Sequence, residues 1–321
     1  MAGSRDYIIK RLISLPVAVF LTVTVVFFLF NVLPGDAAQI ILGRAGAGNP
    51  YLLEENRKWL GLDRPVYVRY VEWVSGLLRG DLGVSLISKE PVTHLISRTF
   101  PTTMVLTVSA ALLALAVGLP TGIIAGLKRG SKYDLLASTI AVLVAATPSF
   151  WLGLMLILVF SVWFRILPSG GFTLSILFSN PAEGVARLVL PSITLSSWMM
   201  ANVSRITRSS ILEELNQDYV MTAKSKGLPN RIVVSKHVLR NALIPITTVS
   251  ALQIVWTVGG SVITESVFRV YGMGNALLNA VYSRDFPVVQ GCILVIVITI
   301  VIINFVTDLM YRYLDPRIRL Q

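Results

Sequence analysis

Six long stretches of this 321-residue chain contain no Asp, Glu, Lys, Arg or His, and every such side chain lies in the segments between them. A helix needs about 20 apolar residues to cross a bilayer. The pattern therefore predicts an all-α integral membrane protein with six transmembrane helices. The predicted spans are Leu12–Val32, Pro101–Leu127, Leu135–Phe164, Leu188–Ser204, Asn241–Ile263 and Val288–Thr307.

Two of these spans depart from the simple pattern. The fourth is the shortest, and it holds the polar residues Ser192, Thr194, Ser196, Ser197 and Asn202. The third is too long for an upright helix, so we expect a kink at Thr147-Pro148 or an end that runs into the membrane interface.

The first span follows three basic residues, Arg5, Lys10 and Arg11, as a secretory signal would. Its apolar run is longer than the ~7–15 residues of a cleavable signal, and no small-residue cleavage site follows it. We expect a helix that is retained.

Composition agrees with a membrane protein. Hydrophobic residues make up 54% of the chain and charged residues 14%, and the mean hydropathy is +0.72. This composition excludes a soluble enzyme, a disordered protein and a secreted disulfide scaffold, because soluble domains carry about 25% charged residues. A single cysteine, Cys292, and two histidines, His94 and His237, leave little for a metal site.

The basic residues predict the orientation. With a cytoplasmic N-terminus, the inside segments hold 16 Lys and Arg in 68 residues, and the outside segments hold 12 in 115. Because inside loops are enriched in basic residues, both termini are expected in the cytoplasm of a multi-pass cell-membrane protein. Much of the net charge of +11 is then a topological signal, and nucleic acid is a poor partner for it. The long external segment is residues 33–100, and the large cytoplasmic loop is residues 205–240.

The sequence offers little for catalysis. No span contains a group that could bind a coupling proton, which argues against a proton-driven carrier but leaves sodium coupling open. No Gly-Lys dipeptide occurs, so the chain has no phosphate-binding loop of the G-x-x-x-x-G-K-[ST] kind. A Ser/His/Asp triad stays open on composition alone, although nothing near His94 suggests one.

The cytoplasmic loop is the most informative segment. The spacing of Leu212, Leu215, Tyr219 and Ala223 predicts a helix over Ser209–Lys226 that ends at a left-handed Gly227. Asn230 is expected to cap a second short helix that runs through His237 toward Arg240. The loop could simply be solvated, but an apolar stripe must be buried by a partner protein or by the chain's own spans.

The run from Asp218 to Leu228, followed by His237 to Pro245, resembles the cytoplasmic coupling loop of ABC importer permeases. The resemblance is closest to the dipeptide/oligopeptide/nickel class, the OppB/DppB branch. The loop departs from the general permease signature at Met221 and Thr222, and His237 and Arg240 stand where Ile and Pro are usual; the peptide class departs similarly. Further motifs of the class occur in order along the chain: Leu33-Pro34-Gly35-Asp36, Leu60-Gly61-Leu62-Asp63-Arg64-Pro65, Gly80-Asp81-Leu82-Gly83-Val84-Ser85, Gly259-Gly260-Ser261-Val262-Ile263-Thr264-Glu265, Tyr271-Gly272-Met273-Gly274, Arg284-Asp285-Phe286-Pro287-Val288-Val289-Gln290 and Leu314-Asp315-Pro316-Arg317-Ile318.

This resemblance implies a type I ABC importer permease that forms one domain over residues 1–321. The chain would supply half of a transmembrane pathway for peptides, and a second, similar permease would supply the other half. Two ATPase subunits would bind ATP and Mg²⁺ and dock on the cytoplasmic loops, and an external binding protein would deliver the solute. The chain itself would be no enzyme and would hold no cofactor or metal. The same machine could instead carry oligosaccharides or nickel.

The resemblance also assigns the ATPase contacts. They are Tyr219, Thr222, Ala223, Lys226, Gly227 and Leu228, with His237 and Arg240 bracing the loop against its own helices. Asn202, Gln253 and Asn304 are polar residues within spans that could line a pathway or hydrogen-bond between helices. An ion-coupled secondary carrier and a membrane scaffold are the alternatives from other classes.

Overall fold

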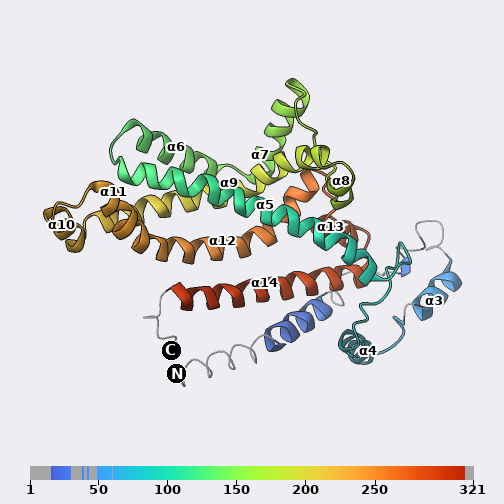
Figure 1. Ribbon diagram of the computed structural model, residues 1–321. Coiled ribbons are helices and arrows are strands. Elements are labelled where there is room, and N and C mark those ends of the chain that lie inside the picture. The colour runs from blue at the N-terminus through green and yellow to red at the C-terminus, as the bar shows by residue number, and fades with distance from the viewer. Residues whose placement is uncertain (1–15, 30–37, 40–41, 43–48, 60, 315–321) are drawn as a thin grey trace, which may run out of the picture. The chain divides into compact units, whose positions relative to one another are not determined.

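The computed structural model describes residues 16–29, 38–39, 42, 49–59 and 61–314. Within these residues the chain forms helices, with one isolated bridge between Val84 and Pro91 and no strand. Four long helices dominate Figure 1: α5 (Val92–Leu127), α9 (Pro181–Leu215), α12 (Leu239–Val267) and α14 (Phe286–Leu314). The others are Pro16–Leu29, α3 (Pro50–Trp59), α4 (Val66–Leu78), α6 (Lys132–Ala146), α7 (Ser149–Leu156), η1 (Ile157–Trp163), α8 (Leu174–Ser179), α10 (Asp218–Ser225), α11 (Asn230–Ile232), η2 (Val233–Val238) and α13 (Met273–Tyr282).

Three described helices are long and apolar enough to cross a membrane: Val92–Leu127, Asn230–Val267 and Phe286–Thr307. They contain the predicted second, fifth and sixth spans. The described part of the first span is the helix Pro16–Leu29. Its ends, the motif Leu33-Pro34-Gly35-Asp36 and residues 315–321 lie outside the described residues.

The third predicted span is broken, as its Thr147-Pro148 sequence indicated. Helix α6 ends at Ala146, α7 begins at Ser149, and the two helices are bent by 106°. Proline lacks a backbone N–H and forces the residue before it into an extended conformation, and Thr147 has φ −85° and ψ 127°. The two halves together count as a fourth candidate span.

The fourth predicted span lies inside α9, which is 35 residues long. Helix α9 contacts α6, α7, α8 and α12. Its hydroxyl residues Ser192, Thr194, Ser196 and Ser197 are buried among these neighbours. A helix that is covered by other helices needs less apolar surface than one that faces lipid, which explains the weak hydropathy of this span.

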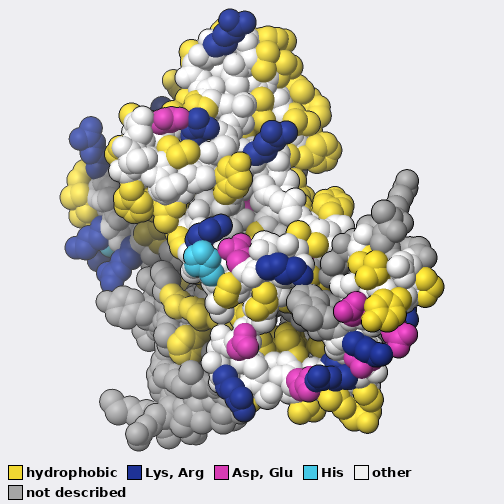
Figure 2. Space-filling view, turned by 90° about the vertical axis from the view of Figure 1, so that its right-hand side faces the viewer, with side chains coloured by type: hydrophobic (Ala, Val, Ile, Leu, Met, Phe, Trp, Pro, Cys, Tyr) yellow, Lys and Arg dark blue, Asp and Glu magenta, His cyan; other side chains and the backbone are white. Residues whose placement is uncertain are grey.

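By contrast, α7 and η1 are uncovered on one side, while Leu156, Ile157 and Phe160 pack against a core cluster. Trp151, Leu154, Trp163 and Phe164 are all exposed. Figure 2 shows hydrophobic side chains over the upper part of the molecule, where α7 and η1 rise in Figure 1. An exposed apolar surface of this kind is what a lipid-facing segment requires.

Two compact units share the chain. The first comprises residues 1–102 and 271–301, and the second comprises residues 103–270 and 302–321. The expected single permease domain over 1–321, with 33–100 external and 205–240 as its cytoplasmic loop, stays a prediction.

The first unit has a core where the start of α5 meets α13 and α14. An added Cβ at Gly291 of α14 would lie 2.6 Å from Cγ1 of Val92, the first residue of α5, so α5 and α14 approach closely there. Nearby, the buried carboxylate of Asp285 accepts hydrogen bonds from the Ser85 hydroxyl (2.5 Å) and the Leu86 N–H (3.0 Å). Two motifs that are 200 residues apart are thereby joined.

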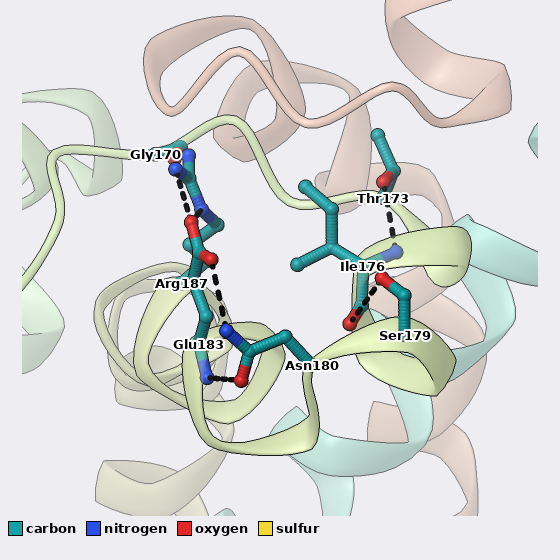
Figure 3. A network of polar contacts seen from close by, with 7 residues as sticks. All are labelled: Gly170, Thr173, Ile176, Ser179, Asn180, Glu183 and Arg187. Atoms are coloured by element: carbon teal, nitrogen blue, oxygen red, sulfur yellow. Dashed lines mark hydrogen bonds and ion pairs between the residues drawn. The ribbon is translucent and has the colours of Figure 1, made fainter.

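In the second unit, residues 165–180 are fixed against the start of α9 by the polar network of Figure 3. The Glu183 carboxylate accepts from the Arg187 guanidinium (2.7 Å), which also donates to the Gly170 carbonyl (2.7 Å). The Asn180 side chain accepts from the Glu183 N–H (3.4 Å) and caps α9, and the Thr173 hydroxyl caps α8.

Candidate functional site

The connection between α9 and α12, residues 216–238, contains most of the residues that the sequence singled out. A single helix over Ser209–Lys226 was predicted, and that prediction is wrong. Helix α9 continues from its span to Leu215, and α10 begins afresh at Asp218. Asn216 closes the last turn of α9 by donating its side-chain amide to the Leu212 carbonyl (2.9 Å), and Gln217 is extended. Asparagine side chains compete in this way with the helical hydrogen-bond ladder.

The end of α10 is a left-handed turn, as predicted. Gly227 has φ +76°. Its N–H donates to the Lys224 carbonyl (2.9 Å), and the Leu228 N–H donates to the Ala223 carbonyl (3.3 Å). This pair of bonds is the Schellman arrangement, which satisfies carbonyls that the helix end would otherwise leave without partners.

The second helix differs from its prediction in two ways. Pro229, and not Asn230, occupies the position before its first residue, and no side chain caps it. Pro229 itself is extended, with φ −62° and ψ 141°, and therefore lies just outside the helix. The helix also does not stop near Arg240: it passes through the π-helical segment η2 into α12. His237, half-buried, and Arg240, exposed, therefore lie on the continuous extension of a spanning helix.

The apolar face of α10 is buried by the chain itself. Val220 is 0% exposed and Ala223 is 7% exposed, and both pack with Ile211, Val233 and Val238. The predicted stripe put Tyr219 on the buried face, but Val220 occupies that face instead. The prediction failed because the break at residues 216–217 changes the direction in which the side chains of α10 point relative to those of α9. The chain's own helices thus supply the surface that the stripe required.

The opposite face of α10 and its turn are open. Tyr219, Thr222, Lys226, Gly227 and Leu228 are exposed, so five of the six predicted contact residues are accessible, whereas Ala223 lies in the core. Met221, also exposed, adds an apolar side chain to this face. The exposed face is therefore mixed, with apolar, hydroxyl and basic groups on one short helix.

Tyr219 connects three helices. Its hydroxyl donates to the Glu214 carboxylate at the end of α9 and accepts from the Asn241 side chain (3.0 Å) at the start of α12. Burial, and then the hydrogen bond to Glu214, raise the pKa of Tyr219 above its usual value. The phenol therefore stays protonated and can hold both contacts at neutral pH. Sequence reasoning found Tyr219 but neither of its partners.

An ion pair between α6 and α9 was not found from the sequence. The Asp134 carboxylate pairs with the Arg208 guanidinium through both oxygens, one of them 2.9 Å from Nη2, and accepts the Gly130 N–H (3.0 Å). It ties the turn before α6 to α9. The available signal was an acidic residue in the first turn of a helix, directly after the Gly130-Ser131 turn.

Close packing of α5 against α9 also supports the site. Gly118, Gly122 and Gly126 recur every four residues, and an added Cβ at Gly122 would lie 2.5 Å from the Ser204 carbonyl oxygen. The Thr121 hydroxyl donates to the Ser204 hydroxyl across the same contact (3.1 Å). Small residues at this spacing let two membrane helices approach until their backbones touch.

The three candidate pathway residues lie in different settings. The Asn202 side chain donates to the Trp198 carbonyl of its own helix (3.0 Å). Gln253 is half-buried, and its Oε1 has no partner among the described residues. Asn304 is half-buried on α14. Among the described residues no group of three His, Cys, Asp or Glu could hold a metal ion.

Comparison with known proteins identifies the family to which this chain belongs. The family profile described as "Binding-protein-dependent transport system inner membrane component" matches residues 118–320, and its N-terminal companion matches residues 5–107. Relatives include the dipeptide transport permease DppB of Escherichia coli K12, which is 37% identical over 98% of both chains, and the di/tripeptide permease DppB of Pseudomonas aeruginosa, 39% identical over 98% of both. The glutathione permease GsiC of E. coli K12 is 38% identical over 98% of this chain and 99% of its own.

Solved structures share the fold. The inward-facing MetNI methionine ABC transporter matches with a TM-score of 0.56 and 19% identity over 70% of this chain and 97% of its own. An amino acid ABC transporter solved with histidines matches with a TM-score of 0.50 and 17% identity, over 69% and 94%. On the family match and this shared fold, the chain belongs to the binding-protein-dependent transport system inner membrane components, the membrane-embedded permease subunits of ABC importers, in which separate subunits hydrolyse ATP.

Proposed function

We propose that this permease carries peptides. The observation that carries the proposal is the identity of 37–39% over nearly the whole chain to permeases named for dipeptides, di/tripeptides and glutathione, itself a tripeptide. Oligosaccharides and nickel remain the alternatives within the same machine. An ion-coupled secondary carrier is the alternative from another class.

The proposed topology has six spans with both termini in the cytoplasm. The higher density of basic residues in segments 128–134 and 205–240 supports this orientation. The connection 216–238 then faces the cytoplasm, and the unit that holds the Ser85–Asp285 contact contributes external structure.

The proposed assembly contains a second, similar permease, two ATPases that bind ATP and Mg²⁺, and an external solute-binding protein. The present chain would contribute no cofactor site. Asn202, Gln253 and Asn304 are proposed to line the pathway, which their half-buried positions within spanning helices allow.

The ATPase contact is proposed on the open face of α10 and its turn: Tyr219, Thr222, Lys226, Gly227 and Leu228. Ala223 would support the contact by packing in the core beneath α10. His237 and Arg240, on the extension of α12, would brace the loop against its own helices. The arrangement is suited to transmit force. Helix α10 is fixed from behind by the Val220 core and the Tyr219 bonds, and the following helix is continuous with a span. Packed contacts of this kind move as rigid elements between discrete arrangements.

Purification from native membranes in mild detergent, with every co-purifying chain identified, tests the assembly. We expect a second permease and one or two ATPases. Recovery of the chain alone or as a homodimer, in a detergent that preserves a known importer, would contradict the proposal. Uptake driven by a sodium gradient without ATP would favour the secondary carrier.

A further inference from the structure

A cavity of about 280 Å³ lies in the second unit, where the break between α6 and α7 meets α9 and α12. Helix α9 contacts α6, α7 and α12 directly, and α7 also contacts α12 (Figure 1). Six hydroxyl side chains line it: Thr147, Ser149, Thr194, Ser197, Thr257 and Thr264. No acidic, basic or histidine side chain does so, and the cavity lies along predicted spans.

The hydroxyls of the lining differ in whether they already have a hydrogen-bond partner. Thr147 donates to the Leu143 carbonyl (2.7 Å) and Ser197 to the Thr194 carbonyl (2.8 Å). Thr194 and Thr264 are each 1% exposed, and among the described residues nothing hydrogen-bonds their Oγ1 atoms. Buried polar groups are normally satisfied, and lipid cannot satisfy them. These two oxygens are closed to water in the structure, so a ligand reaches them only when the threonine side chains rotate, whereas Thr147 and Ser149 are half-buried and present accessible hydroxyl side chains to the cavity.

The chemistry of the lining selects the ligand class. A hydroxyl both donates and accepts, so it can pair with either an amide N–H or an amide carbonyl. Without a charged group in the lining, neither a cation nor an anion is favoured. Trp198 and Trp256, 46% and 70% exposed, add indole surfaces against which side chains of any type can pack.

We propose that this cavity is a transit site that binds the neutral backbone amides of the cargo peptide during passage. The inference rests on the proposed peptide cargo. Because backbone amides are common to all peptides, such a site passes many sequences at low affinity. Selection among peptides would then be made before the membrane.

Two adjacent glycines on α12 provide a matched test. A Cβ added to Gly260, which lines the cavity, would meet only Leu195 Cδ1, at 3.8 Å, and a Cβ added to Gly259, which does not line it, would meet nothing within 4 Å. Gly260→Leu should therefore fill the cavity without a backbone clash. In proteoliposomes with the purified complex and its binding protein, peptide moved per ATP hydrolysed should fall toward background. Gly259→Leu should leave this ratio unchanged.

The wild-type complex separates the two possible failures. If wild type moves no peptide, the peptide cargo is wrong and the transit site falls with it. If wild type and Gly260→Leu move peptide with equal efficiency, the transit site alone is wrong. A fall in peptide transport and ATP hydrolysis together would indicate damaged coupling and would also overturn the cavity assignment.

Protection from chemical labelling gives an independent readout that does not depend on transport. Gly260→Cys and Gly259→Cys are made in a Cys292→Ala background and treated with an uncharged methanethiosulfonate in the purified complex. A tripeptide should slow labelling at position 260 and not at 259, and maltose should protect neither. Adding Ser149→Ala, which removes a half-buried hydroxyl of the lining, should raise the peptide concentration for half-protection roughly two- to tenfold, the loss expected for one neutral hydrogen bond. Equal labelling with and without peptide would refute the site.

Discussion

Gly227 provides the sharpest test of the coupling assignment. Its φ of +76° closes the Schellman turn after α10, and an added Cβ would meet no atom within 4 Å. A substitution here therefore acts through backbone conformation and not through a clash. Gly227→Val places a β-branched side chain in the left-handed region, whereas Gly227→Asn places there a residue that tolerates it.

The size of the effect follows from what holds α10. A non-glycine residue in the left-handed conformation costs about 1–2 kcal/mol, and more when the side chain is β-branched. Burial of Val220, which is 0% exposed, is one of the main contacts that dock α10, beside the Tyr219 hydrogen bonds, and full burial of a valine stabilises by roughly 1.5–3 kcal/mol. The two quantities are comparable, so Gly227→Val should shift the balance between docked and undocked α10 by roughly 5- to 30-fold. The spanning helices are held by other contacts and should stay folded.

The assay compares wild type, Gly227→Val and Gly227→Asn in the assembled transporter, measuring partner co-purification and ATP-dependent uptake. We expect normal yield of the permease, reduced uptake for the valine variant, and near-normal uptake for the asparagine variant. Wild-type uptake by Gly227→Val would refute the role of the turn. An equal loss in both variants would show that bare backbone at the ATPase surface matters, and the conformational argument would be wrong.

Three further substitutions test the supporting structure. Asp134→Asn should lower the free energy of unfolding by roughly 1.5–3 kcal/mol, because charge-assisted bonds to Arg208 are lost; a double-mutant cycle with Arg208→Ala that shows no coupling would contradict this. Gly122→Ala should cost about 1–3 kcal/mol by forcing α5 from α9, with Gly259→Ala as the neutral control in thermal unfolding of the purified complex. Asp285→Ala should speed protease cleavage within residues 80–90, because the turn loses its carboxylate acceptor; unchanged cleavage would show that other contacts hold the segment.

The sequence pattern located the spans that face lipid better than the one that is covered by protein. The second, fifth and sixth spans are continuous apolar runs, and helices occupy them. Helix α9 contains the predicted fourth span, but it is not among the described helices that are long and apolar enough to cross a membrane. Its polarity is tolerated because its neighbours bury its hydroxyls. Local rules succeeded wherever one residue dictates the backbone, as at Pro148 and Gly227.

Contacts between segments that are far apart along the chain could not be predicted from a single sequence. Nothing in the spacing of Ser85 and Asp285 shows that they meet. The break at Asn216 was hidden because the residues on either side of it continue a plausible helical pattern. The glycine series at 118, 122 and 126 was visible in the sequence and indicates close helix packing, although it does not identify α9 as the partner.

ATP-dependent peptide uptake tests the central claim most directly. The complex purified through this chain is reconstituted into vesicles with its binding protein and a labelled tripeptide, with ATP on the ATPase side. We predict accumulation that requires both ATP and the binding protein and persists when sodium and proton gradients are abolished. Accumulation that follows an ion gradient and ignores ATP would contradict the account.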